Sequence, residues 1–112
     1  MTTYFISRHP GAREWMAAQA LAVNEFVAHM NIEQVAPLDT VIGTLPVHLA
    51  ARVCAAGARY MHLSVDVPEH LRGRELNAAQ LAALGASLEQ YRVERIAPDA
   101  SGVDVASRTH IT

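Results

Sequence analysis

Short runs of β-prone residues alternate with helical segments, and this alternation constrains the fold of the chain more than any other feature. The runs at residues 2–7, 40–43 and 59–65 are rich in aromatic and β-branched side chains, which is typical of buried strands. A fourth run, at 87–96, alternates imperfectly and is interrupted by charged residues, which is typical of a strand at the edge of a sheet. We therefore expect four strands.

The segments between these strands have helical periodicity. Residues 12–30 carry apolar side chains at helical spacing, so the pattern predicts one long helix there. Thr44 followed by Pro46 is a helix-start signal, a hydroxyl cap and a proline, and Gly57 supplies the left-handed residue that ends the helix. Each of the first two helices thus connects two strands.

The last third of the chain contains a polar loop, at residues 66–75, and a short helix. Asn77 with Gln80 three residues later predicts a capping box, and Gly85 ends that helix. Residues 97–112 show no sustained period and are expected to form a flexible tail after a single domain at 1–96. The order βαβαβαβ predicts an α/β fold, a mostly parallel sheet with helices on both faces. Right-handed crossovers suggest the strand order 3-2-1-4.

Composition narrows the class of protein. The chain has 112 residues, nine basic residues against eleven acidic ones, and a net charge of −2, which argues against a broad DNA-binding surface. The single cysteine excludes a disulfide framework and a thiolate zinc site, and the histidines lack metal-ligand spacing. No signal peptide or membrane-spanning run is recognisable, so we expect a cytoplasmic protein without a membrane partner. The glycine motifs of dinucleotide sites and P-loops are absent, and we expect neither a cofactor nor a metal.

Ligands bind parallel α/β sheets at the carboxyl ends of the strands, so we expect the functional residues there. The first strand runs into the helix through Ser7, Arg8, His9, Gly11, Ala12 and Arg13. Free amides and the positive end of a helix favour a phosphate, an arginine can clamp it, and His9 can exchange a proton near neutral pH. The alternative is an ordinary junction in which Ser7 caps the helix and His9 is merely exposed.

The second and third strands end in similar residues. The second is followed by Gly43, Thr44, Leu45 and His48, which offer a close backbone approach, a hydroxyl group and a second helix start. The third is followed by Arg72 and Arg74, which could close over a phosphodiester. Each set is also compatible with a capped helix or a solvated loop. Because the first two strands are expected to be neighbours, both helix starts should lie at one edge of the sheet.

These junctions carry a resemblance to a known family. The runs SRHPGAREW at 7–15, GTLPVHLAARVCAAGARYMHLSVDVP at 43–68 and RGREL at 72–76 closely resemble the CRISPR-associated accessory proteins of type III loci. The resemblance extends from the first strand to about Val93. It implies a compact Rossmann-like fold and a ring nuclease, an enzyme that cleaves cyclic tetra-adenylate without metal to linear products ending in a 2′,3′-cyclic phosphate. It also implies a homodimer whose two-fold axis matches the symmetry of the ring.

The implied reaction suggests roles for the strand-end residues. Attack by a ribose 2′-hydroxyl on its own phosphate needs in-line geometry, a proton acceptor and stabilisation of the phosphoryl oxygens. The phosphate contacts are assigned to Arg8, the backbone around Gly11, and Thr44. His9 is the first candidate for proton transfer and His48 the second. Arg72 or Arg74 would cover the ring.

Three other classes of protein fit parts of the sequence. A non-catalytic sensor of cyclic oligoadenylate would use the same anion sites. A histidine phosphatase is suggested by Arg8 and His9, although Pro10 breaks the Arg-His-Gly spacing of that motif. An interaction subunit of the effector complex would leave the arginines and histidines at the strand ends without a purpose.

Overall fold

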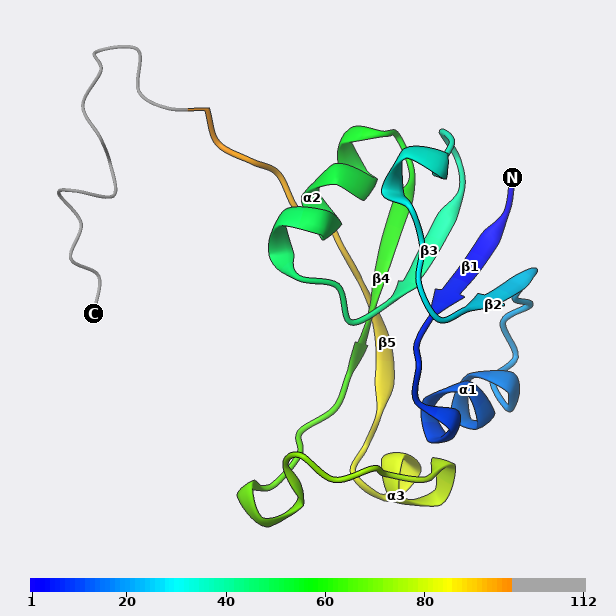
Figure 1. Ribbon diagram of the computed structural model, residues 1–112, viewed down its shortest axis with the longest axis vertical. Coiled ribbons are helices and arrows are strands. Elements are labelled where there is room, and N and C mark those ends of the chain that lie inside the picture. The colour runs from blue at the N-terminus through cyan, green and yellow to red at the C-terminus, as the bar shows by residue number, and fades with distance from the viewer. Residues whose placement is uncertain (98–112) are drawn as a thin grey trace, which may run out of the picture.

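The protein is described by a computed structural model for residues 1–97, in which five strands form one sheet in the order β2-β1-β3-β4-β5 (Figure 1). The central strands β1 (Thr3–Ile6), β3 (Thr40–Gly43) and β4 (Arg59–Ser64) are parallel. The edge strand β2 (Glu25–Val27) is parallel to β1, and the other edge strand, β5 (Ser87–Tyr91), is antiparallel to β4. The predicted α/β class, with a mostly parallel Rossmann-like sheet, is confirmed.

Helices cover both faces of the sheet, as parallel strands require. Helices α1 (Pro10–Ala17) and α3 (Ala78–Ala83) contact each other, and in Figure 1 they lie together at the end of the sheet away from α2 (Val47–Ala55). Two short 3-10 turns, η1 (Ile32–Gln34) and η2 (Glu69–Leu71), complete the regular elements of residues 1–97. None of these helices is both long and apolar enough to cross a membrane.

The hydrophobic core is divided by the sheet into two clusters. Successive residues of β3 take opposite sides, so that Ile42 joins one cluster and Val41 the other, as the period of a strand requires. The cluster under α1 and α3 contains Phe5, Ala12, Trp15, Met16, Ile42, Leu63 and Leu81. The cluster under α2 contains Ile32, Val35, Val41, Ala50, Val53, Ala58 and Tyr60. Short helices and the loops next to them pack on the two faces of the sheet and cover both clusters.

The long helix predicted at residues 12–30 is wrong, because α1 ends at Ala17 and residues 25–27 form β2. Asn24 accepts a hydrogen bond from the Thr3 amide at 2.7 Å and donates its own amide to the Thr3 carbonyl at 2.9 Å, which starts the pairing. Residues 25–27 therefore pair with the edge of β1, although good helix formers precede them in the sequence. Tertiary pairing overrides local propensity here.

The predicted strand order 3-2-1-4 is also wrong. The four predicted strands lie in chain order, and the unpredicted β2 occupies the far side of β1. The last strand does lie at an edge, as predicted, but it ends at Tyr91 rather than Ile96. Of the expected tail at 97–112, all residues after Ala97 lie outside the described part of the chain.

The predicted helix ends are partly confirmed. Asn77 and Gln80 form the complete capping box at α3, and Gly57 and Gly85 have φ of 85° and 78° after their helices. Thr44 is not a cap, because α2 begins after Pro46, which holds the N-cap position without a side-chain hydrogen bond. Similarly, His9 rather than Ser7 is the N-cap residue of α1.

Gly11 allows α1 to touch the segment that leads into α3. It is buried, and a Cβ built on it would lie 1.9 Å from the Leu76 carbonyl oxygen and 2.9 Å from the Cα of Asn77. Those atoms are backbone and cannot turn aside as a side chain could. Because Gly11 has no side chain, residues 76–77 can pack directly against the first turn of α1.

We expect Gly11→Ala to destabilise the fold by about 1–3 kcal/mol, the usual cost of overpacking a core contact. Helix propensity alone predicts the opposite, a gain of about 0.5–1 kcal/mol. Urea unfolding monitored by Trp15 fluorescence distinguishes the two, with Ala17→Ser at an exposed position of the same helix as the control. A stabilised Gly11→Ala variant would show that the contact with Leu76 is loose.

Asp39 ties the start of β1 to the turn before β3. Its carboxylate is 4% exposed and accepts the Thr2 amide at 2.8 Å and the Ala36 amide at 2.9 Å. The hydrogen bonds from Ala36 and Thr2 lower the pKa of Asp39 below its ordinary value of 3.8. The charged form is therefore the one that stabilises the fold.

A group whose pKa is lowered by folding contributes stability above its unfolded pKa, and loses it as the pH falls through the folded value. We therefore expect the stability gap between the native chain and Asp39→Asn to be full at pH 6 and to shrink below about pH 4. Urea unfolding at several pH values measures it. Asp66→Asn removes the same charge from an exposed loop and is the control. A gap that does not change with pH would contradict the assignment.

Candidate functional site

The carboxyl ends of β1 and β3 meet at one edge of the sheet and form a cavity there. Phe5 pairs with Ile42 in parallel register, and continuing this register brings Ser7 alongside Thr44. The cavity has a volume of about 160 Å³ and lies between these strand ends, α1 and the segment leading into α3. It is lined by Phe5, Ile6, Ser7, His9, Ala12, Gly43, Thr44, Leu63, Arg74, Leu76 and Leu81. The two predicted junctions therefore share one cavity.

His9 at the mouth of this cavity is paired with a carboxylate. Its Nδ1 lies 2.9 Å and 3.1 Å from the two carboxylate oxygens of Glu75, and both side chains are exposed, at 60% and 67%. An exposed pair of this kind adds little to stability. Its chemical effect is on orientation, because a carboxylate that accepts the Nδ1 proton leaves Nε2 available to exchange a proton with a ligand.

The loop that carries His9 is braced by main-chain contacts. The Ser7 amide donates to the Val27 carbonyl at 2.9 Å, and the Ser7 hydroxyl accepts the His9 amide at 3.1 Å. Arg13 donates its Nε to the Ser7 carbonyl at 3.0 Å. Arg13, which the sequence placed among the phosphate ligands, therefore holds the loop in shape with one of its donors.

A hydroxyl on the other side of the sheet holds the turn that carries Thr44. Tyr60 is 2% exposed, and its oxygen accepts the Leu45 amide at 2.9 Å, donates to the Gly43 carbonyl at 3.1 Å, and lies 2.7 Å from Nδ1 of His62. Burial raises the pKa of Tyr60 above its ordinary value, so the phenol keeps its proton. Since the hydroxyl has one hydrogen, it can donate to Gly43 and still bind His62 when His62 carries a proton on Nδ1.

Tyr60→Phe should destabilise the protein by about 1–3 kcal/mol, because the Leu45 amide and the Gly43 carbonyl lose their partner. Amide hydrogen exchange at Leu45 should also become faster than in the native chain. Tyr91→Phe is the matched control, since the Tyr91 hydroxyl contacts only the exposed Glu89, at 3.3 Å, among the described residues. Unchanged exchange at Leu45 would show that the turn holds without Tyr60.

The two glycines among the candidate site residues, Gly11 and Gly43, allow close packing. Gly11 faces Leu76 as described above, and a Cβ on Gly43 would lie 2.9 Å from the Ile6 carbonyl oxygen. Ala12 is buried and lines the cavity with its side chain, whereas Leu45 does not line it and contributes its amide to Tyr60. The backbone at Gly43 still forms part of the cavity wall.

Apart from Arg13, which braces the loop after β1, the three candidate arginines lie in different places. Arg74 is exposed and lines the cavity, while Arg8 is exposed and does not line it. Arg72 donates Nε to the Val67 carbonyl at 3.2 Å and lines a separate cavity with Asp66. The sequence analysis expected Arg72 or Arg74 to cover a ligand, and of the two it is Arg74 that lines this cavity.

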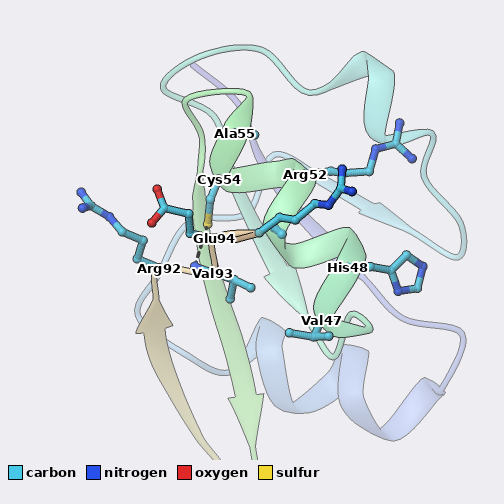
Figure 2. Close-up of a pocket in the computed structure, with 10 residues that line it drawn as sticks. Val47, His48, Arg52, Cys54, Ala55, Arg92, Val93 and Glu94 are labelled. Atoms are coloured by element: carbon cyan, nitrogen blue, oxygen red, sulfur yellow. Dashed lines mark hydrogen bonds between the residues drawn. The ribbon is translucent and has the colours of Figure 1, made fainter. Parts of the chain in front are cut away.

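His48, the second candidate for proton transfer, is separated from His9. It lies on α2 and lines a different, larger cavity of about 760 Å³, between α2 and residues 92–95. Figure 2 shows His48 pointing to one side of α2 and Arg92 pointing to the opposite side, so these groups do not converge. The Val93 amide donates to the Cys54 sulfur at 3.4 Å, which holds the segment after β5 on α2.

No group of three or more His, Cys, Asp or Glu side chains among residues 1–97 is arranged to hold a metal ion. The polar side chains that line the cavity are those of Ser7, His9, Thr44 and Arg74, and Glu75 pairs with His9.

Sequence reasoning missed Glu75 and the Tyr60–His62 pair. Glu75 is 66 residues from His9, so only the tertiary fold reveals their contact, although it lies within the motif at 72–76. Tyr60 and His62 are two residues apart in a segment predicted to be a strand, and this spacing, which puts them on one face, is the signal that could have placed them together.

Comparison with known proteins points to one family. The family model described as "Putative CRISPR-associated protein (Cas_VVA1548)" matches residues 4–94 of this chain. A stretch of 51 residues is 49% identical to a phosphoribosyl imidazole-4-carboxamide isomerase of Symbiobacterium thermophilum, and covers 46% of this chain but 20% of that protein. The chain thus spans a fifth of the length of that relative. No solved structure matches.

Proposed function

The chain belongs to this family of CRISPR-associated proteins, and from that premise we propose that it is a ring nuclease of type III antiviral defence. Its substrate would be cyclic oligoadenylate, most simply cyclic tetra-adenylate, cleaved without metal to linear products with a 2′,3′-cyclic phosphate. The alternative is a sensor that binds the same ring without cleaving it.

The pairing of His9 with Glu75 is the observation that carries this proposal. A binding protein needs donors for phosphate, whereas a histidine held by a carboxylate at 2.9 Å is the arrangement used to move a proton. His9 lines the cavity formed by the strand ends, which Thr44 and Arg74 also line. This favours an enzyme over the sensor.

The proposed reaction can be written as a balanced step that uses the side chains at the cavity and water. Nε2 of His9 accepts the proton of a ribose 2′-hydroxyl, and the 2′-oxygen forms a bond to the adjacent phosphorus. The bond from phosphorus to the 5′-oxygen of the next nucleotide breaks, and that oxygen takes a proton from water or from the imidazolium. Arg74 and Thr44 stabilise the charge on the phosphoryl oxygens. The reaction needs no other reactant: one bond from phosphorus to a 5′-oxygen is replaced by one bond to a 2′-oxygen.

The size of the cavity bears on the proposed homodimer. A volume of about 160 Å³ is well below the roughly 300–1,000 Å³ of pockets that enclose drug-sized ligands. The cavity of one chain can therefore enclose only part of one nucleotide and leaves the rest of the ring outside. Two copies related by a two-fold axis would supply two equivalent sites to a ring with the same symmetry.

The test is an assay with labelled cyclic tetra-adenylate, with and without chelator. We expect the native chain to give linear product in both, and His9→Ala to slow cleavage by about 10²–10⁴-fold with binding little changed. Glu75→Ala should slow it less, because the imidazole remains but loses its orientation.

His70→Ala is the control, since His70 is an exposed histidine that does not line the cavity. Equal turnover by His9→Ala would remove the proposed role of His9. Stoichiometric binding with no linear product from the native chain would instead establish the sensor.

A further inference from the structure

The cavity at the ends of β1 and β3 has an apolar floor and a polar rim. The side chains at its rim are half-buried or exposed and carry hydrogen-bonding groups; they are Ser7, His9, Thr44 and Arg74. The side chains beneath them are hydrocarbon and mostly buried; they are Phe5, Ala12, Leu63, Leu76 and Leu81. The proposed chemistry uses only the rim, so the floor has no role in it.

The volume of the cavity and the hydrocarbon side chains of its floor determine which part of a ligand can enter. An apolar cavity of about 150 Å³ in a protein core is large enough to bind benzene, and this one measures about 160 Å³. A phosphate or a ribose would lose its water on entering and find no side-chain partner among the hydrocarbon groups, at a high cost in free energy. The two faces of a flat aromatic base are apolar and can pack against these hydrocarbon side chains, while its polar edge stays toward the open side.

We infer that this cavity seats one nucleobase of the substrate, with the phosphodiester held outside it at the rim. The inference rests on the proposed function in taking the substrate to be a nucleotide, and adds which part of it is buried. The cavity is open on one side, so the faces of a purine contact the floor while its polar edge and the rest of the nucleotide lie at the opening, toward Ser7, Thr44 and Arg74. The base then acts as an anchor that places its own phosphate beside His9.

Recognition of the base would depend on shape more than on hydrogen bonds. The floor side chains carry no donor or acceptor, and a hydrophobic pocket discriminates only weakly between ligands of the same shape. Adenosine and inosine should therefore bind with similar affinity.

The experiment is an NMR titration of the native chain, with labelled leucine methyl groups and amides, by adenosine up to its solubility limit. Adenosine should shift the methyl signals of Leu63, Leu76 and Leu81. Ribose 5-phosphate, which has no base, should shift the amide of Thr44 and leave those methyl signals in place.

Two variants with the same substitution on one helix sharpen the test. Ala12→Leu fills the cavity from α1 and should weaken adenosine binding by at least about tenfold. Ala17→Leu adds the same side chain at an exposed position and should not change it. If Ala12→Leu does not fold, the positions of the shifts in the native chain still decide the question.

The inference is overturned if adenosine shifts none of the three leucines, if its shifts fall beside α2 instead, or if a folded Ala12→Leu binds it unchanged. The titration contains no ring to cleave, so it separates the two proposals. Adenosine in the cavity without cleavage of cyclic tetra-adenylate contradicts the ring nuclease alone. Cleavage without adenosine in the cavity contradicts this inference alone.

Discussion

The parallel pairing of β1 with β3 is the constraint on which the candidate site depends. It brings the ends of two strands that are far apart in sequence to one edge of the sheet, with Ser7 beside Thr44. Both residues of the pair Val41 and Ile42 are fully buried, one in each hydrophobic cluster, so a shift of register by one residue would exchange the two clusters. The packing of both faces of the sheet therefore also fixes the geometry of the cavity.

A second constraint joins the loop before α3 to this edge. The contact between Gly11 and the Leu76 carbonyl holds residues 74–77 over the start of α1, which puts Glu75 next to His9 and Arg74 at the cavity. On the opposite face, Tyr60 holds the turn at Gly43 and Leu45. Few exposed side chains at the cavity are therefore available to react with a ligand, and most of the polar contacts around them stabilise the surrounding loops. This division explains why Arg13, Arg72 and Gly11, which the sequence named as candidates, do not line the cavity.

The fold class and the location of the candidate site could be predicted from the sequence, because both follow from local patterns. Strand-type runs, the capping box at Asn77 and the left-handed Gly57 depend on neighbouring residues only. β2 could not be predicted in this way, since residues 25–27 become a strand by pairing with β1 and not by their own pattern. Glu75 and Tyr60 were missed for the same reason: each acts through a contact with a distant segment.

The most direct measurement for the central claim is a crystal structure of the His9→Ala variant soaked with cyclic tetra-adenylate. We predict one linkage of the ring at the junction of β1 and β3, with a phosphate oxygen within hydrogen-bonding distance of Thr44 or Arg74. A ring bound in the larger cavity between α2 and residues 92–95, away from Ser7 and Thr44, would contradict the account.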